Sequence, residues 1–416
     1  MPDTPLPTKT FSIHTLGCKL NFSESSDIAR QLKEAGFVLD DHPDFIIVNS
    51  CAVTETAVKK ARNLVSKLHR QHPEAEIVIF GCYAALEPLI IKQWEGVGAV
   101  FGSADKHHAI QYLKGEPLPE AQPFTASFSS GDRTRSFLKV QDGCDYYCSY
   151  CTVAKARGGS RSDTIEHVMC QLEKIAELNV KEVILTGVNL ADFGKKNGES
   201  FYDLLVKIDQ SALVPRVRIS SVEPNLLYDE IIELVAHSKT IMPHFHIPLQ
   251  SGSDRILRLM QRRYGRALFQ NKIDMIKRQM ADAFIAIDII SGFPTESSED
   301  FEDSYNFLAK LPLSFLHVFT YSKRPGTPAA MMKQVKDSVK RERTDRLLLL
   351  SEQKKQDFYR QFIGQTRPVL FESDCIDGKM YGFTDNYIKV GIPWREDWAN
   401  RIVDVMIDQQ QTLGHF

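Results

Sequence analysis

The chain has 416 residues, enough for two or three domains, and 43% of them are hydrophobic and available to fill their cores. Its 51 Lys and Arg and 53 Asp and Glu give a formal charge of -2, so any surface that attracts nucleic acid must be local. No run approaches the roughly 20 apolar residues of a membrane span, and residues 1–10 lack the apolar segment of a signal peptide. We therefore expect a soluble, cytoplasmic protein with no membrane partner.

The first hundred residues alternate between strand and helix patterns. Apolar strands are expected at 11–16, 45–48 and 76–80, with helices at 21–36 and 55–72 and a short helix that ends near residue 94. Units at this spacing predict a parallel sheet with right-handed crossovers. Three cysteines, Cys18, Cys51 and Cys82, each follow one of the strands. Because the carboxyl ends of parallel strands share one edge, we expect the three thiols to meet there; the alternative is three small buried residues.

A second and longer series of strand–helix units follows a Pro-, Ser- and Gly-bearing linker at 115–136. Six strands are expected at 137–140, 183–185, 217–219, 245–249, 285–290 and 316–319. This pattern predicts a partial (βα)6 barrel whose chemistry lies at the carboxyl ends of its strands. Short polar motifs stand at those ends. Since His244 and His246 alternate along the fourth strand, we expect at most one of them to face the barrel interior and neither to bind a metal.

A cysteine loop comes directly after the first barrel strand. Cys144, Cys148 and Cys151 are separated by three and by two residues, so one tight loop can bring them to one inorganic centre. Thiolates are strong ligands for zinc and for iron–sulfur clusters. The loop contains no fourth Cys or His to complete a tetrahedral zinc site, whereas a four-iron cluster held by three cysteines keeps one iron free. A cluster is therefore the favoured interpretation, with a zinc knuckle as the alternative.

The last hundred residues read as a long basic helix at 331–360 followed by short strands at 368–371, 379–384, 387–390 and 402–406. The strands predict a small β-barrel. The helix either connects the barrel to the C-terminal strands or contacts phosphate. Residues 361–416 carry five Lys and Arg against eight Asp and Glu, a weak surface for phosphate. RNA contacts are therefore expected from local groups: Lys340 to Arg346, the KKAR run at 59–62, or Phe383 and Tyr387, which are equally suited to a barrel core.

Several motifs resemble one known family along nearly the whole chain. The cysteine loop, with Tyr150 before its last cysteine, resembles the radical S-adenosylmethionine (SAM) enzymes. The stretches TLGCKLN (15–21), NSCAVT (49–54), FGCY (80–83), RGGSRS (157–162), PLQSGS (248–253) and GFP (292–294) resemble the methylthiotransferases of that superfamily. The opening motif and GFTDNY (382–387) are similar to the branch that acts on N6-threonylcarbamoyladenosine (t6A) at position 37 of tRNA.

The resemblance implies an α/β protein of three parts with two [4Fe-4S] clusters and SAM. The parts are an N-terminal methylthiotransferase domain (9–118), a radical SAM barrel with its connecting helix (134–362) and a TRAM-like β-barrel (363–416). By resemblance, Cys144, Cys148 and Cys151 bind the cluster that cleaves SAM, and Cys18, Cys51 and Cys82 bind an auxiliary cluster through which sulfur is delivered. All six cysteines are thus the expected catalytic and metal-ligating residues.

The predicted SAM contacts lie at the strand ends of the barrel. Many radical SAM enzymes contact the amino group of SAM with a Gly-Gly-Glu motif, and here Thr186, Gly187 and Asn189 take that place, which departs from the pattern. The remaining candidates are Tyr150 beside the cluster, Ser221 and Glu223 for the ribose hydroxyls, Gln250 for the pocket wall and Arg161 for the methionine carboxylate. For each polar residue the alternative is a helix cap or a loop hydrogen bond.

The expected reaction is insertion of a methylthio group at C2 of the adenine of t6A in tRNA. An aromatic C–H offers neither a leaving group nor an acidic proton, so the reaction needs radical chemistry, which cofactors supply. A low-potential donor such as ferredoxin or flavodoxin is implied. The alternatives in the same class are N6-isopentenyladenosine in tRNA and an aspartate of a ribosomal protein as substrates. The alternative from a different functional class is a non-catalytic iron–sulfur protein that binds RNA or carries electrons.

Overall fold

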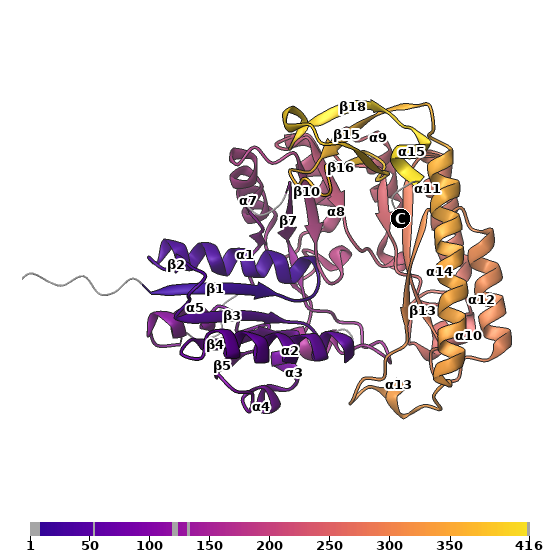
Figure 1. Cartoon of the computed structure of the whole chain (residues 1–416). Coiled ribbons are helices and arrows are strands. Elements are labelled where there is room, and N and C mark those ends of the chain that lie inside the picture. Colours follow the sequence, from indigo (N-terminus) through magenta and orange to yellow (C-terminus); the bar gives the residue numbers. More distant parts are fainter. Residues whose placement is uncertain (1–8, 53–54, 119–123, 131–133, 414–416) are drawn as a thin grey trace, which may run out of the picture.

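The computed structural model describes residues 9–52, 55–118, 124–130 and 134–413. Figure 1 shows an N-terminal sheet with its helices, a central barrel and a small C-terminal sheet. The α/β fold class expected from the sequence is confirmed. Val53 and Thr54, the last residues of the NSCAVT motif, and parts of the expected linker lie outside the described residues.

The N-terminal part is a parallel sheet with helices on both faces. Its strands stand in the order β2-β1-β3-β4-β5. Apolar residues on one face pack against α1 and α5, and those on the other face pack against α2. The three strands expected from the sequence are present, and two more flank them. The elements are β1 (Thr10–Thr15), α1 (Lys19–Glu34), β2 (Val38–Leu39), β3 (Phe45–Ser50), α2 (Glu55–Gln71), β4 (Glu76–Gly81), α3 (Cys82–Leu86), α4 (Pro88–Ile91), β5 (Val97–Phe101) and α5 (His108–Lys114).

The central part is the expected partial barrel of six parallel strands. β7, β10 and β11 pair in parallel, as do β12, β13 and β14, and single bridges from Val217 to Ile241 and from Ser221 to His246 join the two groups. The short β6 (Ser127–Phe128) pairs antiparallel with β7 at the edge. The strands are β7 (Arg135–Lys139), β10 (Glu182–Thr186), β11 (Arg216–Ile219), β12 (His244–His246), β13 (Phe284–Ser291) and β14 (Phe315–Thr320).

Helices cover the outside of the barrel, and one helix of the N-terminal part covers its open edge. The outward residues of the strands form one apolar core with the helices α7 (Ile165–Glu177), α8 (Phe201–Ser211), α9 (Asp229–His237), α10 (Asp254–Leu259), α11 (Arg266–Gln279) and α12 (Ser298–Lys310). α1 packs against β6 and β7, where Ser23 Oγ donates to the carbonyl oxygen of Ser127 at 2.6 Å. The N-terminal part is thereby fixed against the barrel.

The inside of the barrel is polar, and both histidines of β12 face it. The His244 ring lies 4.5 Å from that of Tyr387, and the His246 ring lies 5.0 Å from that of His317. The expectation that at most one of the two histidines faces inward was wrong, because residues two apart on a strand lie on the same face. Other inward groups from the strands include Lys139, Glu182, Thr186, Arg218 and Asp288.

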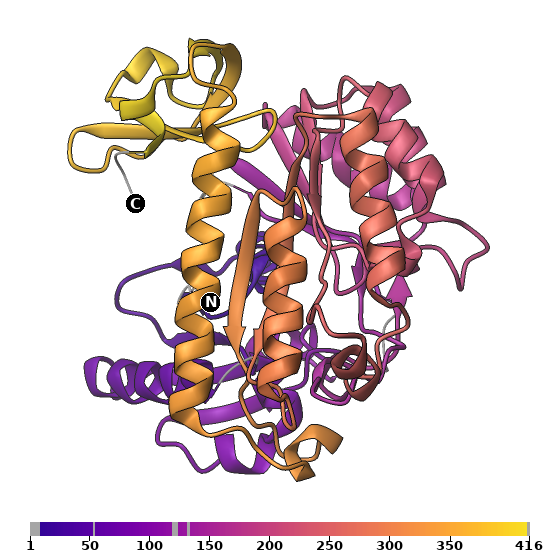
Figure 2. The same ribbon diagram turned by 90° about the vertical axis from the view of Figure 1, so that its right-hand side faces the viewer.

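The basic helix is a connecting element. α14 (Asp337–Arg360) runs along the outside of the barrel, as Figures 1 and 2 show, and begins six residues later than predicted. The preceding segment is instead held to the barrel, since Thr295 N donates to the carbonyl oxygen of Lys333 at 2.9 Å. Lys340, Arg343 and Arg346 form ion pairs with Asp337, Glu296 and Glu302, respectively. The three cations are used within the protein, which favours the connecting role over phosphate contact.

The C-terminal sheet is consistent with the expected small β-barrel. Its strands are antiparallel in the order β17-β16-β15-β18, and a short helix, α15 (Gln409–Leu413), follows them. The sheet packs on the end of the barrel where the strands begin: Arg218 donates to the carbonyl oxygens of Thr384 and Asp385, both at 2.7 Å. The strands are β15 (Thr366–Phe371), β16 (Lys379–Thr384), β17 (Lys389–Pro393) and β18 (Ile402–Met406).

Phe383 and Tyr387 are half-buried and pack against other aromatic side chains. Their rings stack on each other with centroids 4.8 Å apart, and the Tyr387 ring also lies against Phe284 of the barrel. Of the two alternatives, the contacts of Tyr387 support packing against the core. None of the described helices is long and apolar enough to cross a membrane.

Candidate active site

The cysteine loop lies at the carboxyl end of β7, between the short strand β8 (Gln141–Asp142) and α6 (Val153–Arg157). Backbone amides point at two of its sulfurs: Tyr146 N lies 3.3 Å from Cys144 Sγ and Val153 N lies 3.4 Å from Cys151 Sγ. Arg262 donates from Nη1 to Cys148 Sγ at 3.1 Å. Such donors stabilise thiolates that bind iron and tune the reduction potential of a cluster.

A cavity of about 340 Å³ opens over this loop. Its wall contains the three cysteines together with apolar and polar residues from the ends of the barrel strands. Burial raises the pKa of the Cys144 thiol to about 12 and that of Cys151 to about 11. A thiolate in this position therefore needs a cation beside it, which is what an iron site provides.

Four of the predicted SAM contacts line the cavity: Tyr150, Ser221, Glu223 and Gln250. Tyr150 is half-buried and packs against Phe293, with ring centroids 6.4 Å apart, and Ser221 Oγ lies 2.8 Å from Nδ1 of His246. Glu223 forms an ion pair with Arg262; burial raises the pKa of Glu223, and Arg262 opposes this rise.

The cavity wall at the end of β10 is formed by Val188. Its neighbours Thr186, Gly187 and Asn189 are not among the described residues that line the cavity. Thr186 Oγ1 and Asn189 Oδ1 are buried, and neither has a hydrogen-bond partner among the described residues. A buried polar atom without a partner is costly, so these two atoms fit a site that a polar ligand completes. A side chain in place of Gly187 would meet Gln141 Oε1 at 2.9 Å.

Arg161 is not part of the cavity wall among the described residues. Its Nη2 donates to Asp142 Oδ2 at 2.8 Å and its Nη1 to the carbonyl oxygen of Arg157 at 2.6 Å. The structure therefore does not bring Arg161 to the place expected for a methionine carboxylate. The reason is the pairing of β9 (Arg161–Ser162) with β8, which directs the guanidinium toward the carboxylate of Asp142.

The second set of cysteines lies at the carboxyl edge of the N-terminal sheet. Cys18 precedes α1, Cys51 follows β3 and Cys82 begins α3. Gly17, with φ of +116°, lets the chain pass close to this set, since a side chain there would meet Cys51 Sγ at 3.2 Å. Burial raises the pKa of Cys82, while nearby Arg157 lowers it and nearby Cys18 raises it.

Both sets of cysteines adjoin the contact between the N-terminal part and the barrel. α3, which begins at Cys82, packs against α6, which follows Cys151, and Ala52, Cys82 and Ala156 form a small buried cluster there. Arg324, in the wall of the cavity, donates from Nη1 to the carbonyl oxygen of Ala52 at 2.6 Å. One arginine thus joins the cavity to the residue after Cys51.

Neither set is arranged around a single metal ion. The described residues contain no group of three or more Cys, His, Asp or Glu side chains that could hold one ion. A four-iron cluster does not require that arrangement, because each thiolate binds a different iron atom. The donor atoms of the cysteine loop at 144–151 therefore fit a cluster better than the zinc knuckle considered for that loop from the sequence.

Comparisons with known proteins agree with this geometry. Residues 138–308 match the Radical SAM superfamily, and residues 10–102 match the Uncharacterized protein family UPF0004. Over 96% of its length the chain is 36% identical to the threonylcarbamoyladenosine tRNA methylthiotransferase MtaB of Bacillus subtilis, of which it covers 93%. The chain belongs to the radical SAM methylthiotransferase family. It is therefore an enzyme that uses an iron–sulfur cluster and SAM, as the motifs of the sequence had indicated.

Two further similarities are more distant. The chain is 31% identical to the tRNA-2-methylthio-N(6)-dimethylallyladenosine synthase of Staphylococcus aureus, with 96% of this chain and 83% of that protein covered. The structure of the radical S-adenosylmethionine methyltransferase TsrM from Kitasatospora setae superposes with a TM-score of 0.59 at 12% identity, covering 78% of this chain and 77% of that one. The second similarity shows that the fold is shared.

Three residues of this methylthiotransferase site were not found from the sequence: Gln141, Arg262 and Arg324. Gln141 Nε2 donates to the carbonyl oxygen of Gly143 and its Oε1 accepts from Asn189 N, both at 2.9 Å, so it fixes the cysteine loop to the end of β10. Arg262 and Arg324 reach their partners from positions far along the chain. The sequence carries no local signal for such contacts, because periodicity reports only near neighbours.

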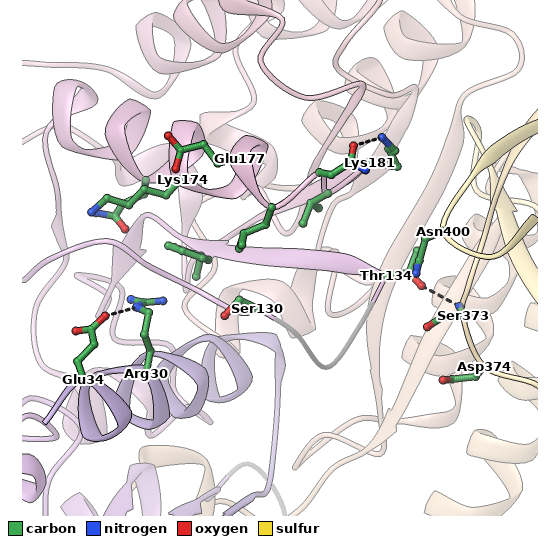
Figure 3. Close-up of a pocket in the computed structure, with 15 residues that line it drawn as sticks. Arg30, Glu34, Ser130, Thr134, Lys174, Glu177, Lys181, Ser373, Asp374 and Asn400 are labelled. Atoms are coloured by element: carbon green, nitrogen blue, oxygen red, sulfur yellow. Dashed lines mark hydrogen bonds and ion pairs between the residues drawn. The ribbon is translucent and has the colours of Figure 1, made fainter. Parts of the chain in front are cut away.

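A second groove of the methylthiotransferase, of about 950 Å³, is lined by none of the six cysteines. It is formed by α1, α7 and the C-terminal sheet, and Figure 3 shows its polar lining. Three cationic side chains, Arg30, Lys174 and Lys181, stand against three acidic ones, Glu34, Glu177 and Asp374. Because these charges balance, the groove is a weak attractant for phosphate.

Proposed function

We propose that the protein is a tRNA methylthiotransferase that inserts a methylthio group at C2 of t6A at position 37. The observation that carries the proposal is the packing of α3, which begins at Cys82, against α6, which follows Cys151, at the contact between the N-terminal part and the barrel. In this proposal Cys144, Cys148 and Cys151 bind the cluster that serves SAM, and Cys18, Cys51 and Cys82 bind a second [4Fe-4S] cluster. Two relatives at 36% identity are threonylcarbamoyladenosine tRNA methylthiotransferases, which supports the tRNA substrate.

Bound SAM and clusters supply the radical chemistry that an unreactive aromatic C–H bond requires. The protein holds the reacting groups together and keeps water out. Tyr150, Ser221, Glu223 and Gln250 bind SAM along the cavity wall, and Thr186 and Asn189 complete its polar contacts. Ferredoxin or flavodoxin supplies the electron. The units 9–118, 134–362 and 363–416 act as the auxiliary-cluster, barrel and C-terminal parts.

The polar interior of the barrel favours t6A over isopentenyladenosine. t6A carries a carboxylate and a hydroxyl on its N6 substituent, whereas the isopentenyl group is apolar. Next to the cavity, His246 Nε2 lies 2.9 Å from Asp288 Oδ1, and the His317 ring is 5.0 Å from that of His246. His317 is exposed to solvent on β14, and partial desolvation by the neighbouring protein lowers its pKa to about 4. A neutral His317 can donate a hydrogen bond to a polar substituent.

Lys19 adds a positive charge near His317. It follows Cys18 at the start of α1, is exposed, and lies close enough to His317 to contribute to the lowering of that pKa. A carboxylate on the substrate would meet this ammonium group. For the RNA backbone, the exposed residues Lys59, Lys60 and Arg62 at the start of α2 are the candidates, because Lys340, Arg343 and Arg346 of α14 are paired within the protein.

The test is anaerobic turnover of the reconstituted protein with SAM, dithionite and tRNA that lacks methylthio groups, followed by mass spectrometry of the nucleosides. The expected product is methylthio-t6A. A methylthio group on isopentenyladenosine would keep the reaction class but contradict the substrate. Unchanged tRNA with formation of 5′-deoxyadenosine would direct the search to a ribosomal protein. Absence of both products would leave the non-catalytic alternative.

A further inference from the structure

A cluster of charged side chains is buried between the N-terminal part and the barrel. Its five members are at most 4% exposed. Arg157 Nη1 donates to Glu24 Oε1 at 2.9 Å and to Asp142 Oδ1 at 3.0 Å. Lys139 Nζ donates to Asp142 Oδ2 at 2.9 Å and also pairs with Glu24, and Lys106 Nζ lies 3.4 Å from Glu24 Oε1. We call these five residues the interdomain ion cluster.

The interdomain ion cluster contains more positive than negative charge. Three cations share two carboxylates, and Arg161 adds a fourth cation at its rim. The neighbouring Asp27 does not correct the imbalance, since it forms its own ion pair with Arg30. Excess charge in a buried place is costly unless an ion of opposite sign lies beside it. The imbalance therefore points to an anionic group next to the cluster.

Arg157 connects the interdomain ion cluster to the second set of cysteines. Its Nη2 donates to Asn21 Oδ1 at 2.8 Å, and the same oxygen lies 3.7 Å from Cys18 Sγ. Asn21 Nδ2 in turn donates to the carbonyl oxygens of Leu16 and Ser50, at 2.8 and 3.3 Å, next to Gly17 and Cys51. The guanidinium group thus stands behind the loops that present the thiols.

Arg157 is also tied to the first set of cysteines. It is the last residue of α6, the short helix that begins just after Cys151. A movement of the SAM-cluster loop would therefore move Arg157. Glu24 and Arg157 are 133 positions apart in the sequence, so their contact joins α1 of the N-terminal part to α6 beside the SAM-cluster loop.

We propose that Arg157, held by Glu24 and Asp142, is a positioning residue that fixes the auxiliary site relative to the SAM-cluster loop and balances the negative charge of the auxiliary cluster. A cluster bound by three thiolates is anionic, and each added electron increases that charge. A buried cation beside it stabilises the reduced form and raises the reduction potential. The inference rests on the two-cluster part of the proposed function.

The test is a reduction titration of the auxiliary cluster alone. A background variant with Cys144, Cys148 and Cys151 replaced by Ala keeps only the second site, and its reduction is followed by electron paramagnetic resonance. Arg157→Met should shift the midpoint to lower potential. Arg157→Lys keeps the charge, so its midpoint should lie close to that of the background variant with Arg157. Arg343→Met is the matched control, because it removes a buried, paired arginine from α14. The control should leave the midpoint unchanged.

A second measurement examines positioning in the chain with all six cysteines. Arg157→Lys loses the forked contact to Glu24, Asp142 and Asn21, so the ratio of 5′-deoxyadenosine to methylthio product should rise while SAM cleavage continues. If Arg157→Met does not fold, Lys106→Met replaces it: this change removes one charge farther from the thiols and should shift the midpoint in the same direction by less.

An unchanged midpoint in Arg157→Met with full iron content would overturn the inference. Failure of the background variant to bind iron would overturn it as well. Neither result depends on tRNA, so the substrate proposal is judged separately by the nucleoside assay.

Discussion

Replacing Gly143 by alanine tests whether the backbone before Cys144 sets the geometry of the SAM-cluster loop. Gly143 has φ of +70°, and a Cβ there would lie 2.1 Å from the carbonyl oxygen of Gly159 and 2.7 Å from that of Gly158. The carbonyl of Gly158 also accepts the hydrogen bond from Cys144 N at 3.1 Å. Since both clashes are with backbone, the side chain cannot be accommodated without moving the loop.

The cost of this change has two parts. A non-glycine residue at positive φ costs about 1 kcal/mol. Overpacking against a backbone that cannot yield adds about 1–3 kcal/mol. Gly198→Ala is the matched control, because Gly198 has φ of +74° and nothing within 4 Å of its Cβ position, so it pays only the first part. The excess cost of Gly143→Ala corresponds to about a 5- to 150-fold lower population of the native loop.

The assay is the rate of 5′-deoxyadenosine formation, with iron content measured on the same reconstituted samples. Gly143→Ala should form 5′-deoxyadenosine at least about fivefold more slowly than Gly198→Ala. Iron should be lost from the SAM-cluster site while the auxiliary site stays filled. Equal rates and equal iron content in the two variants would refute the reasoning that this loop has no freedom to move.

Four further substitutions probe other contacts. Cys51→Ala should abolish methylthiolation yet leave SAM cleavage intact, and loss of both activities would argue against two separate clusters. Arg262→Met removes the donor to Cys148 Sγ and should lower the reduction potential of the SAM cluster in a redox titration; an unchanged potential would contradict this. Arg218→Met breaks a buried ion pair and two bonds to the C-terminal sheet, so that sheet should unfold at lower urea, with a loss of about 3–5 kcal/mol. His317→Leu should reduce methylthiolation of t6A but not SAM cleavage, and equal t6A turnover would refute its contact with the substituent.

The sequence by itself determined the order of the strands and helices and the class of chemistry. Apolar strands followed by amphipathic helices at regular spacing specify parallel sheets, because each element must bury its apolar side. Cys18, Cys51 and Cys82 were placed at one sheet edge on the same argument, and the spacing of the cysteine loop indicated a cluster. These features are local, so they can be read along the chain.

Only the tertiary structure decided which side chains serve the site. Arg262 meets Glu223 across 39 positions and Arg324 meets Ala52 across 272, and no periodic pattern reports contacts at such separations. The same reason applies to two residues with more than one predicted role. Arg161, a predicted SAM contact, forms an ion pair with Asp142, and Tyr387, for which RNA contact and core packing were both considered, packs against Phe284 of the barrel. The fate of a charged or aromatic side chain depends on the partners that folding brings beside it, and those partners come from other parts of the chain.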